Sequence, residues 1–203
     1  NSQVESALEE IIAKSTSQPA HKIRLPPPNF GHDIKRQDAV EQARDLLSDF
    51  QILCIAGLPG SGKSHVASQV VSDLVSTTEM AEAIWYEPLD GGTVVDFHAE
   101  VSIYAEDSPS SIVSRCNSFL GSIYSESSII VIEDFHLVDQ SSYRLLLEQV
   151  TRRHPNVRVI LTSRLHPDAI FSNPAARIFS LPPFSVSEVE TMLSMRGISS
   201  LDL

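Results

Sequence analysis

Cysteine and tryptophan are scarce in this chain of 203 residues, which has two cysteines, Cys54 and Cys116, and one tryptophan. Two cysteines without a recurring spacing exclude a disulfide framework and a cysteine-based zinc site, and they favour a reducing, cytoplasmic setting. The sequence also lacks an apolar run near the ~20 residues of a membrane span, so we expect no membrane association.

Basic residues are few as well. The 15 Lys and Arg residues face 26 Asp and Glu residues, which gives a formal net charge of -11. Such a chain does not attract nucleic acid through its overall charge, because phosphate neutralisation needs clustered cations. Four arginines do lie close in sequence, and we interpret them as a solvated helix end plus one functional arginine: Arg152, Arg153, Arg158 and Arg164.

The remaining composition is that of a globular domain, with 42% hydrophobic and 20% charged residues. The length fits one α/β domain with an appendage, and the chain reads as a piece of a longer polypeptide. Residues 1–14 predict an amphipathic helix, interpreted as the end of an upstream domain. Prolines at 19 and 26–28 rule out regular helix there and predict a surface linker over residues 15–30.

From residue 31 onward, short apolar segments alternate with amphipathic segments. This alternation predicts a parallel sheet covered by helices on both faces. The secondary structure of residues 93–117 is the least clear from the sequence, and we expect two short helices there. The expected strands are 51–56, 83–87, 128–132, 157–161 and 177–181, and the expected helices are 34–48, 63–75, 139–153 and one that begins at Ser185, whose spacing to Glu188 is that of a capping box.

A phosphate-binding motif follows the first of these strands directly. The segment from Gly57 to Ser64 matches G-x-x-x-x-G-K-[ST], and it precedes an expected helix. Glycines let backbone N–H groups wrap phosphates, and the helix N-terminus adds positive potential. Lys63 is expected to bridge the β- and γ-phosphates of ATP or ADP, and the Ser64 hydroxyl to bind Mg²⁺. The candidate nucleotide-contacting residues are Gly57, Pro59, Gly60, Ser61, Gly62, Lys63, Ser64 and His65.

Two carboxylates follow the apolar segment 128–132. Glu133 and Asp134 form a Walker B pattern, in which one acid supports Mg²⁺ and the other polarises the attacking water. We assign Glu133 to the metal and Asp134 to the water, with both as candidate metal and catalytic residues. Because the commoner order is Asp then Glu, the shorter second side chain predicts slow hydrolysis.

Polar residues also follow the next expected strand. Arg164, in Thr162-Ser163-Arg164, could sense the γ-phosphate, since its guanidinium is always charged and forked. The alternative is an arginine that neutralises Glu133 and Asp134. His136 and His166 occupy loops after the strand ends and are further candidates for phosphate contact.

These motifs together resemble the nucleotide-binding domain of STAND NTPases, the class with NB-ARC and MalT-type regulators. The matching segments are Gly57–Ser64, Ile129–Asp134, Val159–Arg164, which resembles the family's sensor motif, and Leu181–Ser185, which resembles its proline motif before a helical lid. The resemblance covers roughly residues 30–196. Departures are His32 where the family has arginine, Pro59 where glycine is frequent, and Glu133-Asp134 in place of two aspartates.

The resemblance implies a three-layer P-loop NTPase core over residues 31–182, of the ASCE/AAA+ type, and a lid that starts at residue 183. It implies a five-stranded parallel sheet with the acidic strand next to the phosphate-loop strand. Phe30 and Pro183 would then contact the adenine or the sugar. The implied function is a switch that responds to a protein trigger, exchanges ADP for ATP and self-associates. An AAA+ ATPase of the origin-recognition or loader type, a pseudo-ATPase and a small-molecule kinase are the alternatives.

Overall fold

The computed structural model describes residues 22–24, 34, 36–77, 82–88, 90–94, 96–97, 128–195 and 197–198. The predicted N-terminal helix, most of the two helices expected between 93 and 117, and Phe30 and His32 lie outside these residues. Within the described part of the chain, no helix combines the length and the apolar character needed to cross a bilayer.

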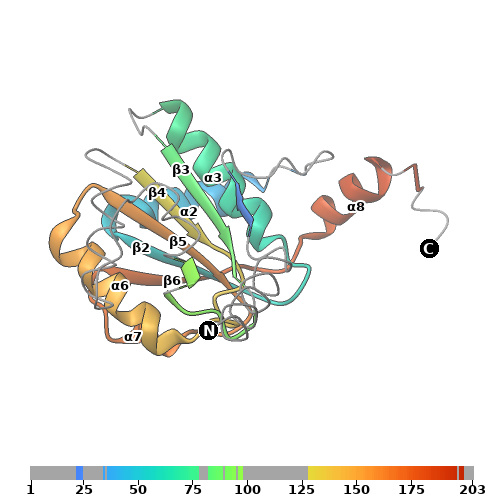
Figure 1. Cartoon of the computed structure of the whole chain (residues 1–203). Helices are drawn as coiled ribbons and strands as arrows, with labels where there is room; N and C mark the ends of the chain where they lie inside the picture. Colours follow the sequence, from blue (N-terminus) through green and yellow to red (C-terminus); the bar gives the residue numbers. More distant parts are fainter. Residues whose placement is uncertain are drawn as a thin grey trace, which may run out of the picture.

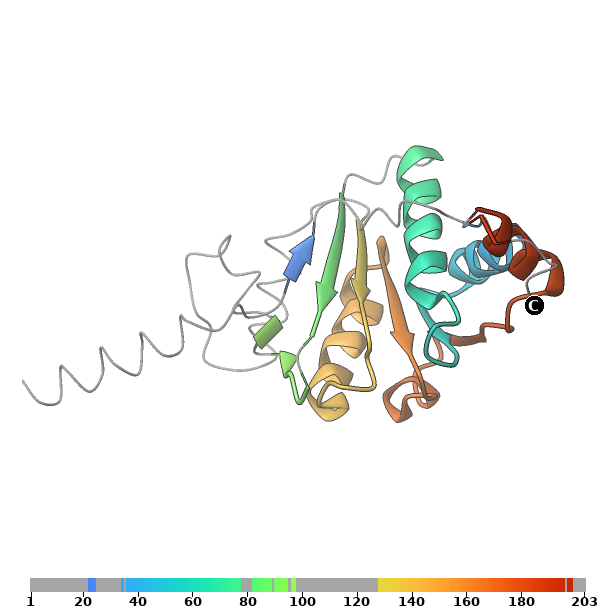
Figure 2. The ribbon, with the colours of Figure 1, turned by 90° about the vertical axis from the view of Figure 1, so that its right-hand side faces the viewer.

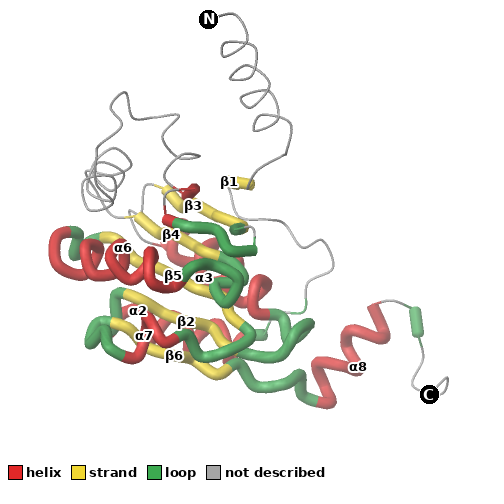
Figure 3. Tube along the Cα trace, turned by 60° about the horizontal axis from the view of Figure 1, so that its bottom comes forward, coloured by secondary structure: helices red, strands yellow, loops and turns green. Residues whose placement is uncertain are grey.

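The core of the molecule is a twisted sheet with the strand order β1-β3-β4-β5-β2-β6 (Figure 3). All neighbours from β3 to β6 run parallel, which confirms the predicted five-stranded parallel sheet. At one edge β1 pairs antiparallel with β3, through residues for which the sequence predicts a surface linker. The strands are β1 (Lys22–Arg24), β2 (Ile52–Ala56), β3 (Glu82–Glu87), β4 (Ser128–Ile132), β5 (Val157–Ser163) and β6 (Ala176–Ser180).

One expectation about strand order is wrong. The acidic strand β4 does not lie next to the phosphate-loop strand β2, because β5 lies between them and pairs with both. Cys54 of β2 is opposite Leu161, and Ile132 of β4 is opposite that same residue on the other side. The strand β5 thus lies between β2 and β4 although it follows α6 in the chain. No local sequence pattern predicts this position.

Helices cover both faces of the sheet and divide the interior into two hydrophobic clusters. The helices α2 (Gln37–Asp49) and α3 (Lys63–Thr77) pack on one face (Figure 2), and α6 (Gln140–Arg153) with the short α7 (Asp168–Phe171) packs on the other. Successive residues of β2 point to opposite faces, so Cys54 joins one cluster and Leu53 the other. Burial raises the pKa of the Cys54 thiol to about 12, which makes it an inert core residue.

The last helix, α8 (Val186–Met195), differs from the others because none of its residues is buried. It extends away from the sheet and its covering helices (Figure 1). Its N-terminus has the predicted capping box: the Ser185 amide donates to Glu188 Oε2 at 2.6 Å, and the Glu188 amide donates to Ser185 Oγ at 3.2 Å. The helix therefore owes its ordering to local bonds and to the few contacts at its first turn.

Candidate functional site

The carboxyl ends of the parallel strands gather the predicted site residues at one edge of the sheet. Ala56 of β2 is opposite Ser163 of β5 and Ser180 of β6, so the residues that follow these strands emerge side by side. The Gly57 amide donates to the Ser163 carbonyl at 3.1 Å, and the Leu181 amide donates to the Ala56 carbonyl at 2.7 Å. Ligands of open α/β sheets bind at this edge.

The phosphate loop needs its glycines for two different reasons. Gly60 and Gly62 have φ values of +76° and +85°, which L side chains rarely adopt. Gly57 has no such angle, but an added Cβ would lie 2.9 Å from Ser61 Oγ and 3.5 Å from Leu181 Cβ. The loop is therefore tightly turned at its far end and closely packed at its start.

Lys63, the first residue of α3, folds back over the loop. Its ammonium group donates to the Gly57 carbonyl at 3.1 Å and to the Leu58 carbonyl at 3.0 Å, and the residue is 7% exposed. Burial lowers the pKa of Lys63, while the negative charge of Asp134 opposes this shift. The lysine thus lies at the loop with a carboxylate nearby, in the position from which its charge can reach bound phosphates.

Glu133 follows β4 and lies beside Ser64. Burial raises its pKa, and the nearby Ser64 hydroxyl and Trp85 indole favour the charged form and partly offset this rise. Neither donor meets hydrogen-bond geometry with Glu133 Oε1, which is a buried oxygen without a partner among the described residues. A buried carboxylate oxygen next to a hydroxyl suits a hard cation such as Mg²⁺.

The described residues contain no group of three or more His, Cys, Asp or Glu side chains that could hold a metal ion by themselves. A P-loop site does not require such a group, because one hydroxyl, one carboxylate, waters and phosphate oxygens share the magnesium ion. The protein ligands would be Ser64 and Glu133, and the remaining ligands would come with the nucleotide.

Asp134 has a strained backbone that β5 holds in place. Its φ is +42°, the only positive value among the described non-glycine residues. The Asp134 amide donates to Thr162 Oγ1 at 3.0 Å, and the Phe135 amide donates to the Thr162 carbonyl at 2.7 Å. Thr162 therefore fixes the turn that carries the second acid. A single threonine at a strand end gives little signal for this role in sequence.

His136 also belongs to this turn. Its Nδ1 lies 3.8 Å from Asp134 Oδ1, and both ring nitrogens are buried without a hydrogen-bond partner among the described residues. Burial lowers the pKa of His136, with the charges of Arg164 and Lys63 acting in the same direction. The ring is thus close to Asp134, and its contact with a phosphate stays a prediction.

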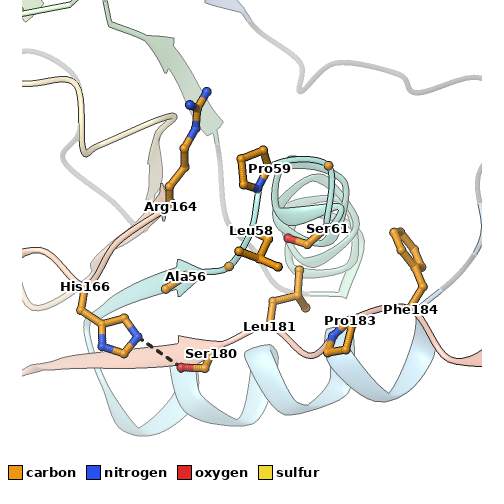
Figure 4. A pocket seen from close by; sticks show the side chains of 12 residues that line it. Ala56, Leu58, Pro59, Ser61, Arg164, His166, Ser180, Leu181, Pro183 and Phe184 are labelled. Carbon is orange, nitrogen blue, oxygen red and sulfur yellow. Dashed lines mark hydrogen bonds between the residues drawn. The ribbon is translucent and has the colours of Figure 1, made fainter.

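A pocket of about 460 Å³ opens beside the phosphate loop (Figure 4). The predicted residues Pro59, Arg164 and Pro183 line it, and so does His166, whose Nε2 lies 3.3 Å from Ser180 Oγ. Its walls combine the exposed loop with the segment after β6. A base or sugar could lie in this cavity against the loop.

His65 is placed differently from the rest of the motif. Its Nε2 lies 2.9 Å from the Ile34 carbonyl and 2.9 Å from the Gln69 side-chain nitrogen. The ring thus joins α3 to the segment before α2 instead of facing the loop.

Arg36 was not predicted from the sequence, and it is the most extensively bonded side chain near the loop. It is 3% exposed and donates to the Ser61 carbonyl at 2.9 Å and to Glu188 Oε1 at 3.0 Å. The resemblance predicts an arginine four residues earlier, at position 32, where this chain has a histidine. In sequence, Arg36 stands in the polar run Lys35 to Asp38 at a helix start, where solvent exposure is the ordinary outcome.

The fold is shared with solved structures at low sequence identity. A STAND protein with a tetratricopeptide repeat sensor from Pyrococcus horikoshii matches 84% of this chain with a TM-score of 0.58 and 17% identity. PCH-2 from C. elegans matches 85% with a TM-score of 0.52 and 16% identity. Drosophila ORC, solved bound to AT-rich DNA and Cdc6, matches 79% with a TM-score of 0.50 and 14% identity.

The chain spans 26%, 52% and 63% of the length of these three solved chains, respectively. No protein-family model matches it, and no curated protein matches its sequence. The strand order, the phosphate loop between β2 and α3, and these structural matches lead to one conclusion: the chain has a P-loop NTPase fold with a five-stranded parallel sheet, and it shares this fold with STAND and AAA+ structural neighbours.

Proposed function

We propose that this chain binds ATP and ADP with Mg²⁺ at the phosphate loop and works as a slowly hydrolysing switch of the STAND type. The observation that supports it most is the meeting of three motifs at one sheet edge. Gly57 is bonded to β5, Glu133 lies beside Ser64, and Asp134 is held by Thr162. The proline segment after β6 lines the pocket next to them.

Each residue has a distinct task in this proposal. The backbone amides of the loop and the Lys63 ammonium bind the phosphates, and Ser64 with Glu133 holds Mg²⁺. The ion, when bound, neutralises charge that develops on the β- and γ-phosphate oxygens. Asp134 orients the attacking water, and Arg164 stabilises charge on the γ-phosphate from the end of β5. His136, Pro59 and Pro183 lie around the bound nucleotide in this proposal.

The first test is the identity of the nucleotide that accompanies the purified chain. The protein is denatured, and the supernatant is separated by anion-exchange chromatography. Stoichiometric ADP supports a switch with a closed resting state. Titration calorimetry with ADP, ATP and GTP then compares wild type with Lys63→Ala, which we expect to lose at least about tenfold in affinity. Equal affinity in the two proteins contradicts the proposed site.

A binding-only role is the second candidate, because Asp134 is the shorter acid in the position of the water-orienting residue. The two functions differ in single-turnover hydrolysis of radiolabelled ATP. A switch with slow turnover loses hydrolysis in Asp134→Asn while ADP affinity is retained. A chain whose wild type hydrolyses no ATP above the buffer rate binds nucleotide only for structure.

A further inference from the structure

Arg36 joins three segments that are distant in sequence. From the N-terminal boundary of α2, its guanidinium donates to the Ser61 carbonyl in the phosphate loop, and to the Pro182 and Pro183 carbonyls after β6 at 3.0 and 3.2 Å. Its Nε donates to Glu188 in α8. Its carbon Cζ also lies 4.6 Å from the centre of the Phe184 ring. Four donated bonds and a ring contact satisfy the fork of a charge that is almost fully buried.

The phosphate loop also packs directly against the segment that leads to α8. A Cβ added at Gly62 would lie 3.3 Å from Phe184 Cζ and 3.9 Å from Arg36 Cδ. A Cβ added at Gly57 would meet Leu181. The loop and the β6–α8 connection are therefore in direct contact, and Arg36 bonds both sides of this contact.

Glu188 is the point at which the arrangement reaches α8. Burial alone would raise its pKa, but the bonds from the Ser185 amide and from Arg36 outweigh this effect and lower the pKa overall. In the described part of the chain, the Arg36–Glu188 bond is the one hydrogen bond between the 186–195 helix and residues before position 181. The other Glu188 oxygen caps the helix itself. One carboxylate thus both starts α8 and docks it.

We propose that Arg36 is a positioning residue that holds the phosphate loop and, through Glu188, couples nucleotide binding at that loop to the docking of α8. This inference rests on the proposed nucleotide function. Binding that fixes the loop around Ser61 also fixes the Arg36 fork, and a fixed fork favours the docked position of Glu188. By thermodynamic linkage, docked α8 favours nucleotide binding to the same extent.

The test is amide hydrogen exchange of the whole chain, with and without ADP and Mg²⁺, in wild type and four variants. Arg36→Lys keeps the charge but loses the fork, and Glu188→Gln weakens the docking bond while it leaves the loop contacts intact. Arg44→Gln is the matched arginine control, since Arg44 lies in α2, the helix that Arg36 precedes, but is exposed and pairs only loosely with Asp73 at 3.8 Å. Glu190→Gln is the control on α8, where that residue is exposed.

In wild type and both controls, ADP is expected to slow exchange in residues 57–64 and in residues 186–195. In Glu188→Gln, ADP should still protect 57–64, but the protection of 186–195 should fall at least about fivefold, because a hydrogen bond to a charged group is lost. In Arg36→Lys, ADP affinity should fall at least about tenfold as well, because the fork that holds Ser61 is lost.

Two failures are distinguishable. If wild type binds ADP and both test variants protect α8 as the controls do, the coupling through Arg36 is overturned and the nucleotide function stands. If wild type binds no ADP, the nucleotide function and the coupling both fail. The positioning role of Arg36 is then decided by exchange without nucleotide, where Arg36→Lys must exchange faster than Arg44→Gln in both segments or that role fails too.

Discussion

At the scale of single residues, the backbone of Asp134 is strained because its φ value lies in the left-handed region. A φ of +42° is tolerated by Asn and Gly, but it is costly for β-branched residues. We predict that Asp134→Asn stays within about 0.5 kcal/mol of wild type in free energy of unfolding. Asp134→Val should lose about 1–3 kcal/mol, because its side chain cannot relax in this region. Urea unfolding without nucleotide measures both.

The comparison has an internal control in Asp134→Gly, which removes the same carboxylate but is free to adopt the angle. If the glycine and valine variants lose equal stability, the lost carboxylate contacts and not the backbone angle determine the cost. A valine variant as stable as wild type would mean that the turn relaxes, and that Thr162 does not hold Asp134 in a strained position.

Glu133 provides a pH-dependent prediction at the same scale. Because burial raises its pKa in the folded state above the usual 4.5, the folded chain binds a proton more tightly than the unfolded chain does. The stability contributed by the protonated group is therefore present near pH 4.5 and is lost as pH rises through the folded pKa. We predict that Glu133→Gln resists urea better than wild type at pH 7, and that the difference shrinks as pH falls to 4.5.

The measurement is the urea midpoint at pH 4.5, 6 and 7.5 without nucleotide or Mg²⁺, so that only the protein's own groups titrate. A stabilised Glu133→Gln that also binds Mg²⁺-ADP less well would identify a carboxylate kept for function at the expense of stability. A variant less stable than wild type at pH 7.5 would show that Ser64 and Trp85 compensate fully for the burial of the charge.

At the scale of elements, α8 is a helix that buries none of its residues and depends on its cap. We predict that Ser185→Ala costs about 1 kcal/mol of local stability, because the bond from the Glu188 amide is lost. The loss should appear as faster amide exchange within 186–195, with the global urea midpoint unchanged. Ser194→Ala, in the last turn of the same helix, is the control. A fall in the global midpoint would mean that α8 unfolds together with the sheet.

The elements that the sequence predicted well are those with a long local signal. The strand β4 was placed at its observed bounds, because a run of buried β-branched residues between polar turns has few other solutions. The three residues of β1 and the four of α7 were missed, since segments this short carry no periodicity. The strand order was also missed, because β5 enters between β2 and β4 by packing that no spacing records.

The site residues divide in the same way, into those with a local sequence signal and those without one. Lys63, Glu133 and Asp134 could be placed because each sits in a contiguous motif next to a strand. Arg36 could not, because its partners lie 25 to 152 residues away and nothing local distinguishes it from a solvated arginine. Long-range polar bonds of this kind depend on the strand order, which no local sequence pattern predicts.

At the scale of the whole molecule, the structure separates the arginines that lie close in sequence. Arg158 stands at the start of β5 and donates to the Leu47 carbonyl at 3.2 Å and the Pro155 carbonyl at 2.7 Å. Arg164 follows the far end of that strand. Six residues of extended chain place the two about 20 Å apart, so they do not form one basic patch. Arg152 and Arg153 lie exposed at the end of α6.

This distribution bears on the DNA-bound ORC structure that shares the fold. With a net charge of -11 and two exposed arginines at one helix end, this domain has few cations to replace the counterions of a duplex. We predict that an AT-rich duplex binds more weakly than about 10⁻⁴ M at about 0.15 M salt, as measured by fluorescence anisotropy. Binding that tightens steeply at low salt and is lost in Arg152→Gln/Arg153→Gln would instead locate a DNA surface at the end of α6. That result would favour an origin-recognition type of ATPase over a protein-triggered switch. The nucleic-acid surface would then lie at the sheet edge opposite the phosphate loop.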